Sequence, residues 1–200
     1  MYKHFLKRII GFFGAFFGFL VLVLPMLAIS IAIKCDSKGP IFFKQKRIGK
    51  NKKEFKIIKF RTMCDHAYEK GGVVSSEDDP RITKVGKFLR RTSMDEFPQV
   101  FNIMAGQMSI IGPRPVLDWE YNECSKEEYE PRFSVRPGMF CTVDVVLRAA
   151  ATREEQFKMD AEYAQNVKFS VDFKTFFKII GMIFSKKNVY KEENEEKKND

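Results

Sequence analysis

The sequence lacks the residue patterns on which several classes of protein depend. Its four Cys residues form no C-x-x-C pair and it has only two His, so neither a disulfide scaffold nor a zinc site is predicted. No G-x-x-x-x-G-K-[ST] or G-x-G-x-x-G segment is present, which disfavours a P-loop nucleoside triphosphatase and a Rossmann enzyme. No internal repeat is evident. The Cys residues are therefore expected to be free thiols in a reducing compartment.

Charged side chains are absent from one long segment. Residues 9–33 carry no charge, and 20 of these 25 residues are apolar. A helix of this length would measure about 37 Å, which is enough to cross the hydrocarbon core of a membrane. A cleaved signal peptide is disfavoured, because the run is longer than a usual signal and no A-x-A site follows it. The segment is expected to remain as a membrane helix.

The charges on both sides of this segment indicate its path. Basic residues precede it, and residues 34–61 contain eleven Lys or Arg against two acids, an excess of +9 that equals the net charge of the whole chain. The positive-inside rule draws both ends of the helix to the cytoplasm. A re-entrant helix over residues 1–34, bent at Pro25, satisfies this rule, since Pro removes a backbone N–H and disturbs the preceding turn. A straight spanning helix is the alternative.

The remaining residues predict an α+β fold, a mostly helical small domain with short strands over residues 35–187. Residues 172–186 place Phe and Ile at helical spacing beside Lys, which is typical of an amphipathic helix at a membrane interface or packed on a core. Residues 64–80 are expected to form a loop, and 188–200 a disordered charged tail. Strands are predicted at 41–43, 55–60 and 110–111, and helices at 82–91, 95–105, 118–130 and 154–165.

The segment Ser93-Met94-Asp95-Glu96 has two interpretations. As structure it is a capping box, with Ser93 capping a helix and Glu96 reaching back. As chemistry, an ionised Asp95 at a helix start is a candidate nucleophile toward phosphorus, and Glu96 a candidate ligand for a divalent metal ion. Basic residues in or beside turns and helix ends suit phosphate binding. The basic residues in such positions are Lys59, Arg61, Arg90, Arg91, Arg114, Arg136 and Arg148. Of these, the candidates for phosphate binding are Lys59, Arg61, Arg114, Arg136 and Arg148.

An ordered series of motifs resembles a known family. The series runs through KFRTM at 59–63, DPRITKVGKFLRRTSMDEFPQ at 79–99, MSIIGPRP at 108–115 and VRPG at 135–138. It is similar to the bacterial sugar transferases, and more closely to the small monotopic phosphoglycosyl transferases, over the chain to about residue 186. Members of that family transfer a sugar-1-phosphate from a UDP-sugar to a polyprenyl phosphate at the cytoplasmic membrane face. They carry a helix bent at a Pro, an Asp-Glu dyad and Mg²⁺.

The resemblance implies a role for each matching residue. Asp95 matches the nucleophile, Glu96 the metal-associated member of the dyad, and Pro25 the helix-bending Pro. Lys59, Arg114 and Arg148 match basic positions near the phosphates. The expected partners are a UDP-sugar, undecaprenyl or another polyprenyl phosphate, and membrane phospholipids, with UMP as product and Mg²⁺ as cofactor. The expected location is the cytoplasmic face of the bacterial inner membrane, and the oligomeric state stays open, a homodimer included.

Two positions and one segment depart from the family pattern. Leu24 stands where the family often has Ser, and Gln107 where it usually has Asp. Residues 139–147 lack the Gly, Trp and Gln that the family typically carries after its R-P-G motif. The resemblance therefore does not fix the donor sugar or the glycan pathway.

A non-enzymatic protein is the alternative function. A single-pass anchor could present residues 34–61 as a basic module to anionic lipids or to a regulatory partner. Nucleic-acid binding is suggested by charge alone, and the apolar helix argues against it.

Overall fold

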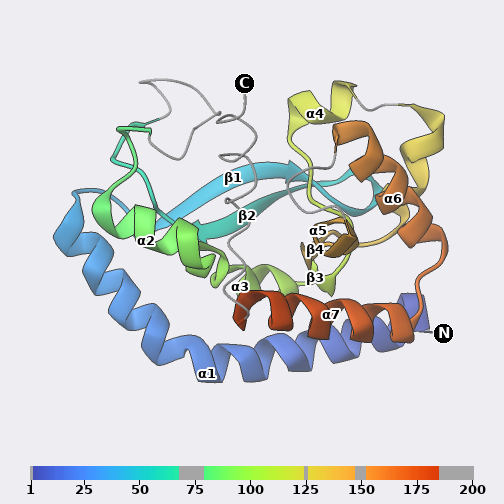
Figure 1. The fold of residues 1–200 in the computed structure, drawn as a ribbon, viewed down its shortest axis with the longest axis horizontal. Helices are drawn as coiled ribbons and strands as arrows, with labels where there is room; N and C mark the ends of the chain where they lie inside the picture. Colours follow the sequence, from blue (N-terminus) through green and yellow to red (C-terminus); the bar gives the residue numbers. More distant parts are fainter. Residues whose placement is uncertain (1, 68–78, 124–125, 147–151, 185–200) are drawn as a thin grey trace, which may run out of the picture.

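The described part of the chain is mostly helical and contains two small sheets. The computed structural model describes residues 2–67, 79–123, 126–146 and 152–184. One long N-terminal helix runs beneath the rest of the chain (Figure 1). The helices are η1 (Tyr2–Leu6), α1 (Lys7–Asp36), η2 (Lys50–Lys52), α2 (Lys84–Thr92), η3 (Met94–Glu96), α3 (Gln99–Met104), α4 (Asp118–Glu123), η4 (Glu127–Ser134), α5 (Thr142–Val146), α6 (Arg153–Gln165) and α7 (Phe169–Phe184).

The two sheets have two strands each. β1 (Phe42–Ile48) and β2 (Glu54–Phe60) form an antiparallel hairpin in which Phe43 faces Lys59. Its turn contains Asn51 at φ 55°, a left-handed conformation that Asn tolerates well. β3 (Ser109–Ile111) and β4 (Gly138–Phe140) pair in parallel. This fold confirms the predicted mixture of many helices and short strands.

The inner face of α1 completes the core. Ala15 packs with Phe55, Ile57, Val100 and Ile103 of β2 and α3. A second cluster joins Met26 and Ile33 of α1 to Phe60 of β2 and Leu89 of α2. The apolar helix therefore holds β2, α2 and α3 together from one side, which fixes the elements that carry the candidate site.

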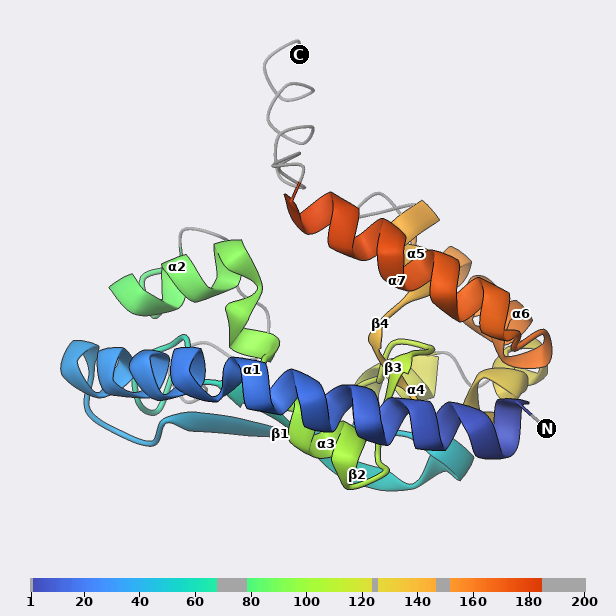
Figure 2. The ribbon, with the colours of Figure 1, turned by 90° about the horizontal axis from the view of Figure 1, so that it is seen from below.

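The outer face of α1 is apolar and exposed. Of its most apolar 18-residue window, only 11% is buried, whereas the core helix of a soluble protein would be mostly buried. Its exposed side chains include Phe17, Val21 and Leu24, which are 61–75% exposed. α7 exposes Phe173 and Phe177, and in Figure 2 it lies to one side of α1, with its start near the N-terminal end of that helix. Such a large apolar surface is typical of membrane association.

Pro25 lies inside α1, and α1 changes direction about midway along its length (Figure 1). A Pro inside a helix lacks the N–H that would bond to residue i−4, and this is a known cause of bends. Both ends of α1 turn toward the rest of the chain, on the same side of the bend.

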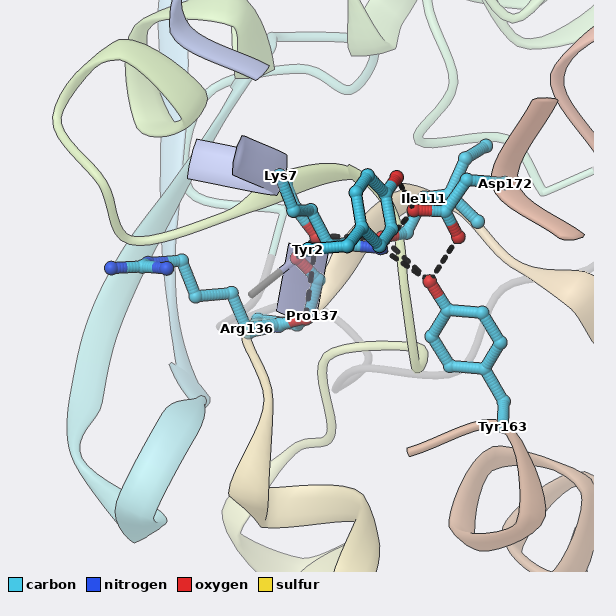
Figure 3. Close-up of polar contacts among 8 residues, drawn as sticks. Tyr2, Lys7, Ile111, Arg136, Pro137, Tyr163 and Asp172 are labelled. Carbon is cyan, nitrogen blue, oxygen red and sulfur yellow. Dashed lines mark hydrogen bonds and ion pairs between the residues drawn. The ribbon is translucent and has the colours of Figure 1, made fainter. Parts of the chain in front are cut away.

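The start of α1 is tied to α7 by a polar network (Figure 3). Lys7 Nζ lies 2.5 Å from Asp172 Oδ2, and both side chains are only 10% exposed. The hydroxyl groups of Tyr2 and Tyr163 also donate to Asp172. The N-terminus and the amphipathic helix are thus fixed to each other.

Two local predictions were wrong or displaced. Ser93 does not form a capping box: it ends α2 in a left-handed conformation and its side chain caps no N–H. The helix expected at 95–105 is split into η3 and α3, because Pro98 provides no N–H in the turn between them. A true capping box lies elsewhere, between Thr152 and Glu155 at the start of α6.

Candidate active site

Three predicted residues from distant parts of the chain meet. Lys59 Nζ on β2 lies 2.6 Å from Glu96 Oε1 and 3.8 Å from Asp95 Oδ2 on η3. All three side chains are partly exposed, at 25% for Lys59, 33% for Glu96 and 15% for Asp95. The arrangement offers an Asp-Glu pair neutralised in part by one cation and open to a ligand.

The backbone around Ser93 places this pair. Ser93 adopts φ 55° and ψ 17°, and its N–H bonds to the carbonyls of Leu89 and Arg90, so the chain turns sharply between α2 and η3. α2 itself lies against the segment after β2: a Cβ at Gly86 would lie 1.9 Å from the carbonyl oxygen of Thr62. Only Gly permits this approach, which brings Asp95 within reach of the strand that carries Lys59.

The surroundings of Asp95 oppose its ionisation. Burial raises the pKa of the Asp95 carboxyl, the Lys59 charge lowers it, and the neighbouring Glu96 raises it again. Arg90 also lowers it. The pKa of Asp95 is raised on balance, so Lys59 is the main group that favours the carboxylate a nucleophile needs.

Arg114 contributes a further cation to the same region. The residue is exposed on the loop that follows β3. Desolvation acts to lower the pKa of its guanidinium, but Cys141, Asp144 and Glu96 outweigh this effect and raise it. Arg114 thus carries a positive charge in the field of the dyad.

A buried ion pair supports the backbone of Arg114. Arg132 Nη2 lies 2.7 Å from Asp160 Oδ2, and the two side chains are 2% and 1% exposed. Arg132 also donates to the carbonyl of Arg114 at 2.9 Å, and the N–H of Arg114 donates to Asp160 at 3.2 Å. The pair therefore holds both polar groups of the Arg114 peptide unit.

Sequence reasoning missed the supporting charges. Arg132 and Asp160 stand among other charged residues in the sequence, and no pattern shows that these two are buried together. Asp144 lies in the segment 139–147 that departs from the family pattern. That departure is the sequence feature that could have pointed to Asp144 as part of the site. Burial raises the pKa of Asp144, while Arg114 lowers it, so this carboxyl group also belongs to the region around Arg114.

The other predicted site residues lie apart from the dyad or outside the described residues. Arg61 is 6% exposed and donates to the carbonyls of Ser37 and Lys38, so it anchors the segment after α1. Arg136 donates to the carbonyl of Gly106, beyond the far end of α3. Arg148 lies outside the described residues. The role of Arg61 and Arg136 at a phosphate stays a prediction.

The Glu96 carboxylate fits a divalent cation that is also bound by a substrate. Lys59 contacts only Oε1 of Glu96, which leaves Oε2 available as a hard oxygen ligand. Among the described residues, no group of three or more His, Cys, Asp or Glu could hold a metal ion. Mg²⁺ is usually bound by one or two carboxylates together with substrate phosphates rather than by an all-protein cage. Glu96 therefore fits Mg²⁺ that arrives with a phosphate substrate.

The fold has a large exposed apolar surface typical of membrane association, and the site joins an Asp-Glu pair to a lysine. The sequence profile of the family described as bacterial sugar transferase matches residues 2–186. The chain belongs to this bacterial sugar transferase family, as the motif resemblance indicates.

Individual relatives agree with this assignment. The chain is 37% identical over 165 residues to the UDP-N-acetylgalactosamine-undecaprenyl-phosphate N-acetylgalactosaminephosphotransferase of Aeromonas hydrophila, covering 80% of this chain and 39% of that protein. It is 42% identical over 141 residues to the exopolysaccharide production protein PSS of Rhizobium leguminosarum, covering 67% and 70%. It is 37% identical over 179 residues to the UDP-glucose:undecaprenyl-phosphate glucose-1-phosphate transferase of Escherichia coli, covering 86% and 39%. The chain thus spans about two fifths of the Aeromonas and Escherichia proteins.

Proposed function

We propose that the protein transfers a sugar-1-phosphate from a UDP-sugar to undecaprenyl phosphate and releases UMP. The observation that carries this proposal is the meeting of Lys59 with Asp95 and Glu96, within a chain of the bacterial sugar transferase family. Two of its relatives are named for this type of transfer, with different sugars. The product would be the lipid-linked sugar that begins a bacterial glycan.

The transfer takes place in two balanced steps. In the first, an Asp95 carboxylate oxygen attacks the phosphorus that carries the sugar, and the bond from this phosphorus to the bridging oxygen breaks, so that UMP leaves. In the second, an oxygen of undecaprenyl phosphate attacks the same phosphorus. The bond to Asp95 breaks, which restores the carboxylate and gives the diphosphate-linked sugar. Lys59 and Arg114 would hold the phosphate oxygens through both steps.

Glu96 would hold Mg²⁺ together with the phosphates of the donor. The ion would supply neutralisation of phosphate charge. Lys59 holds the Glu96 side chain in place, since the 2.6 Å ion pair fixes one of the two carboxylate oxygens and leaves the other for the ion.

The membrane helix would enter the bilayer and return to the cytoplasmic side. The bend of α1, the Pro25 within it and the basic residues at both ends support this path. It would bring the dyad, which follows α2, to the cytoplasmic surface where both the nucleotide sugar and the lipid phosphate are available.

A donor panel tests this function. The full-length protein in detergent, with Mg²⁺ and undecaprenyl phosphate, is expected to release UMP from at least one UDP-sugar and to stop when the metal is chelated. UMP is measured by a coupled luminescence assay, and the lipid product by mass spectrometry. Release of UDP instead of UMP, or no turnover with any UDP-sugar, would contradict the proposal.

The charge of Lys59 is expected to set the acidic limit of the activity. Asp95 must be ionised to attack, burial raises its pKa, and Lys59 lowers it. Lys59→Gln removes the lowering effect, so the pKa rises further and the acidic limb of kcat/KM moves to higher pH. The position of this limb, rather than the height of the profile, is the measurement. Lys56→Gln, an exposed change on the same strand, is the control; equal limbs in both variants would refute the argument.

A further inference from the structure

A recess lined by basic side chains lies away from the dyad. It is a shallow space of about 400 Å³, a figure that includes open solvent, between the start of α1, the β1–β2 turn and the segment before β4. It is lined by Lys3, Arg8, Lys50 and Arg136, and among the described residues that line it none is acidic. The recess borders Ile103, near the end of α3, whereas Asp95 and Glu96 precede the start of that helix. The lining of the recess includes neither the dyad nor Lys59 or Arg114, so the recess is separate from the candidate active site.

The fold positions two of these guanidinium groups. Arg8 donates to the carbonyls of Ile103 and Met104 at 2.6 and 2.8 Å, and Arg136 donates to that of Gly106 at 2.8 Å. Gly106 has φ +81°, and a Cβ there would lie 3.0 Å from Arg8 Nη2. The end of α3 thus draws both Arg side chains to one place through its carbonyl groups.

The two lysines of the recess bring further positive charge. Lys3 donates to the carbonyl of Ala164 at 2.6 Å, which keeps its ammonium group beside the recess. Burial, followed by the charges of Arg136 and Lys3, lowers the pKa of Lys50. Burial and the Arg8 charge likewise lower the pKa of Arg136. The cations therefore repel one another, and an anion among them would relieve this repulsion.

Lys7, which also borders the recess, has its own counter-charge. It is paired with Asp172, and Figure 3 shows Arg136 pointing away from that network. Asp172 is thus already paired with Lys7, and it also accepts hydrogen bonds from Tyr2 and Tyr163. The four remaining cations form half-buried walls around one space, beside the helix whose outer face is apolar.

We infer that this recess binds a phosphate anion, and that the anion is presented by an anionic phospholipid headgroup or by free phosphate. Two Arg side chains suit phosphate oxygens, and Lys side chains add point charges. The position of the recess at the start of the membrane helix gives a headgroup direct access, because basic pockets beside such helices are known sites for anionic headgroups. The site anchors the N-terminal end of α1, independently of the transfer reaction.

The test compares Lys50→Gln with Lys53→Gln. Lys50 borders the recess, while Lys53 is an exposed residue just after the same turn. Both substitutions remove one positive charge. The full-length protein in detergent is titrated with dioctanoyl phosphatidylglycerol, dioctanoyl phosphatidylcholine or inorganic phosphate, and the thermal midpoint is followed. Phosphatidylglycerol is expected to stabilise the parent and Lys53→Gln, with about fivefold weaker binding by Lys50→Gln and about 25-fold by Lys3→Gln/Lys50→Gln.

The three titrants separate the sources of the anion. Stabilisation by phosphatidylglycerol but not by phosphate identifies a lipid site. Stabilisation by phosphate that equals the stabilisation by phosphatidylglycerol identifies a free-anion site. Both results support the inference. Equal binding by Lys50→Gln and Lys53→Gln would overturn it, and so would equal stabilisation by phosphatidylcholine. UMP release by Lys50→Gln at parental KM for the donor is also expected, and a raised KM with unchanged lipid binding would place Lys50 in the donor site instead.

Discussion

Asp95→Asn is expected to lower the rate of UMP release at least about 1,000-fold, or about 4 kcal/mol in activation free energy. The amide keeps the size of the side chain but has no anionic oxygen to attack phosphorus. The partly buried position of Asp95 beside Lys59 gives water little chance to replace it as nucleophile. The measurement is steady-state UMP release, together with mass spectrometry of protein quenched during turnover, in which the parent is expected to carry a phosphosugar on Asp95.

Glu96→Gln separates the two members of the dyad. This variant is expected to keep the nucleophile and to lose most of its Mg²⁺ dependence and activity, so a phosphosugar adduct forms slowly rather than not at all. Turnover of Asp95→Asn at the parental rate would refute the covalent route. Unchanged UMP yields in both variants would refute the enzyme function as a whole.

Arg132→Met is expected to destabilise the protein by about 3–5 kcal/mol, because it leaves Asp160 buried without its counter-charge. For a chain of this size the thermal midpoint should fall by about 10 °C. The loss of support for the Arg114 peptide unit should also lower kcat/KM beyond what the fraction of folded protein explains. Thermal unfolding in detergent and UMP release below the transition measure the two effects separately.

The pKa of Asp160 makes the stability of the parent protein and of Arg132→Met depend on pH. Burial raises the pKa of Asp160 to about 6, above its ordinary value of 3.8, so the folded chain binds more protons than the unfolded chain between these values. Stability from this group is therefore full below about pH 4 and is lost as the pH rises through about 6. Without Arg132 this pKa rises further, and the loss extends to higher pH.

A double variant provides the control for the ion pair. Arg132→Met/Asp160→Asn removes both charges, and it is expected to be more stable than Arg132→Met alone, because no uncompensated charge stays buried. If the double variant is as unstable as the sum of the two single variants, the pair does not act as a unit.

The supports of the site show why sequence patterns predicted the dyad but not its surroundings. Asp95 and Glu96 stand in a recognisable motif, and so does Lys59. Arg61 stands in the same motif as Lys59, yet its side chain turns to the carbonyls of Ser37 and Lys38, which the fold brings beside it. A basic residue near a motif can bind either a ligand or the backbone, and only packing decides between them.

The sequence by itself determined the elements whose cause is local. The uncharged residues 9–33 form part of one apolar helix, the 54–60 strand pairs with its neighbour across a short turn, and the spacing of Phe in 169–184 forms the amphipathic α7. Hydrophobic periodicity decides these elements over a few neighbouring residues. The family motifs also sufficed to identify the bacterial sugar transferase family.

Only the tertiary structure decided which side chains meet. Lys59 contacts Glu96, which is 37 positions away in the chain. Ser93 ends α2 in a left-handed conformation instead of capping a helix start. Arg136 lies with Arg8 in a basic recess. The backbone conformation at Ser93 and the close approach of α2 at Gly86 fix the first of these contacts, and carbonyl groups at the end of α3 hold Arg8 and Arg136. Such contacts depend on packing between residues that are distant in the chain, and local hydrophobic periodicity does not predict that packing.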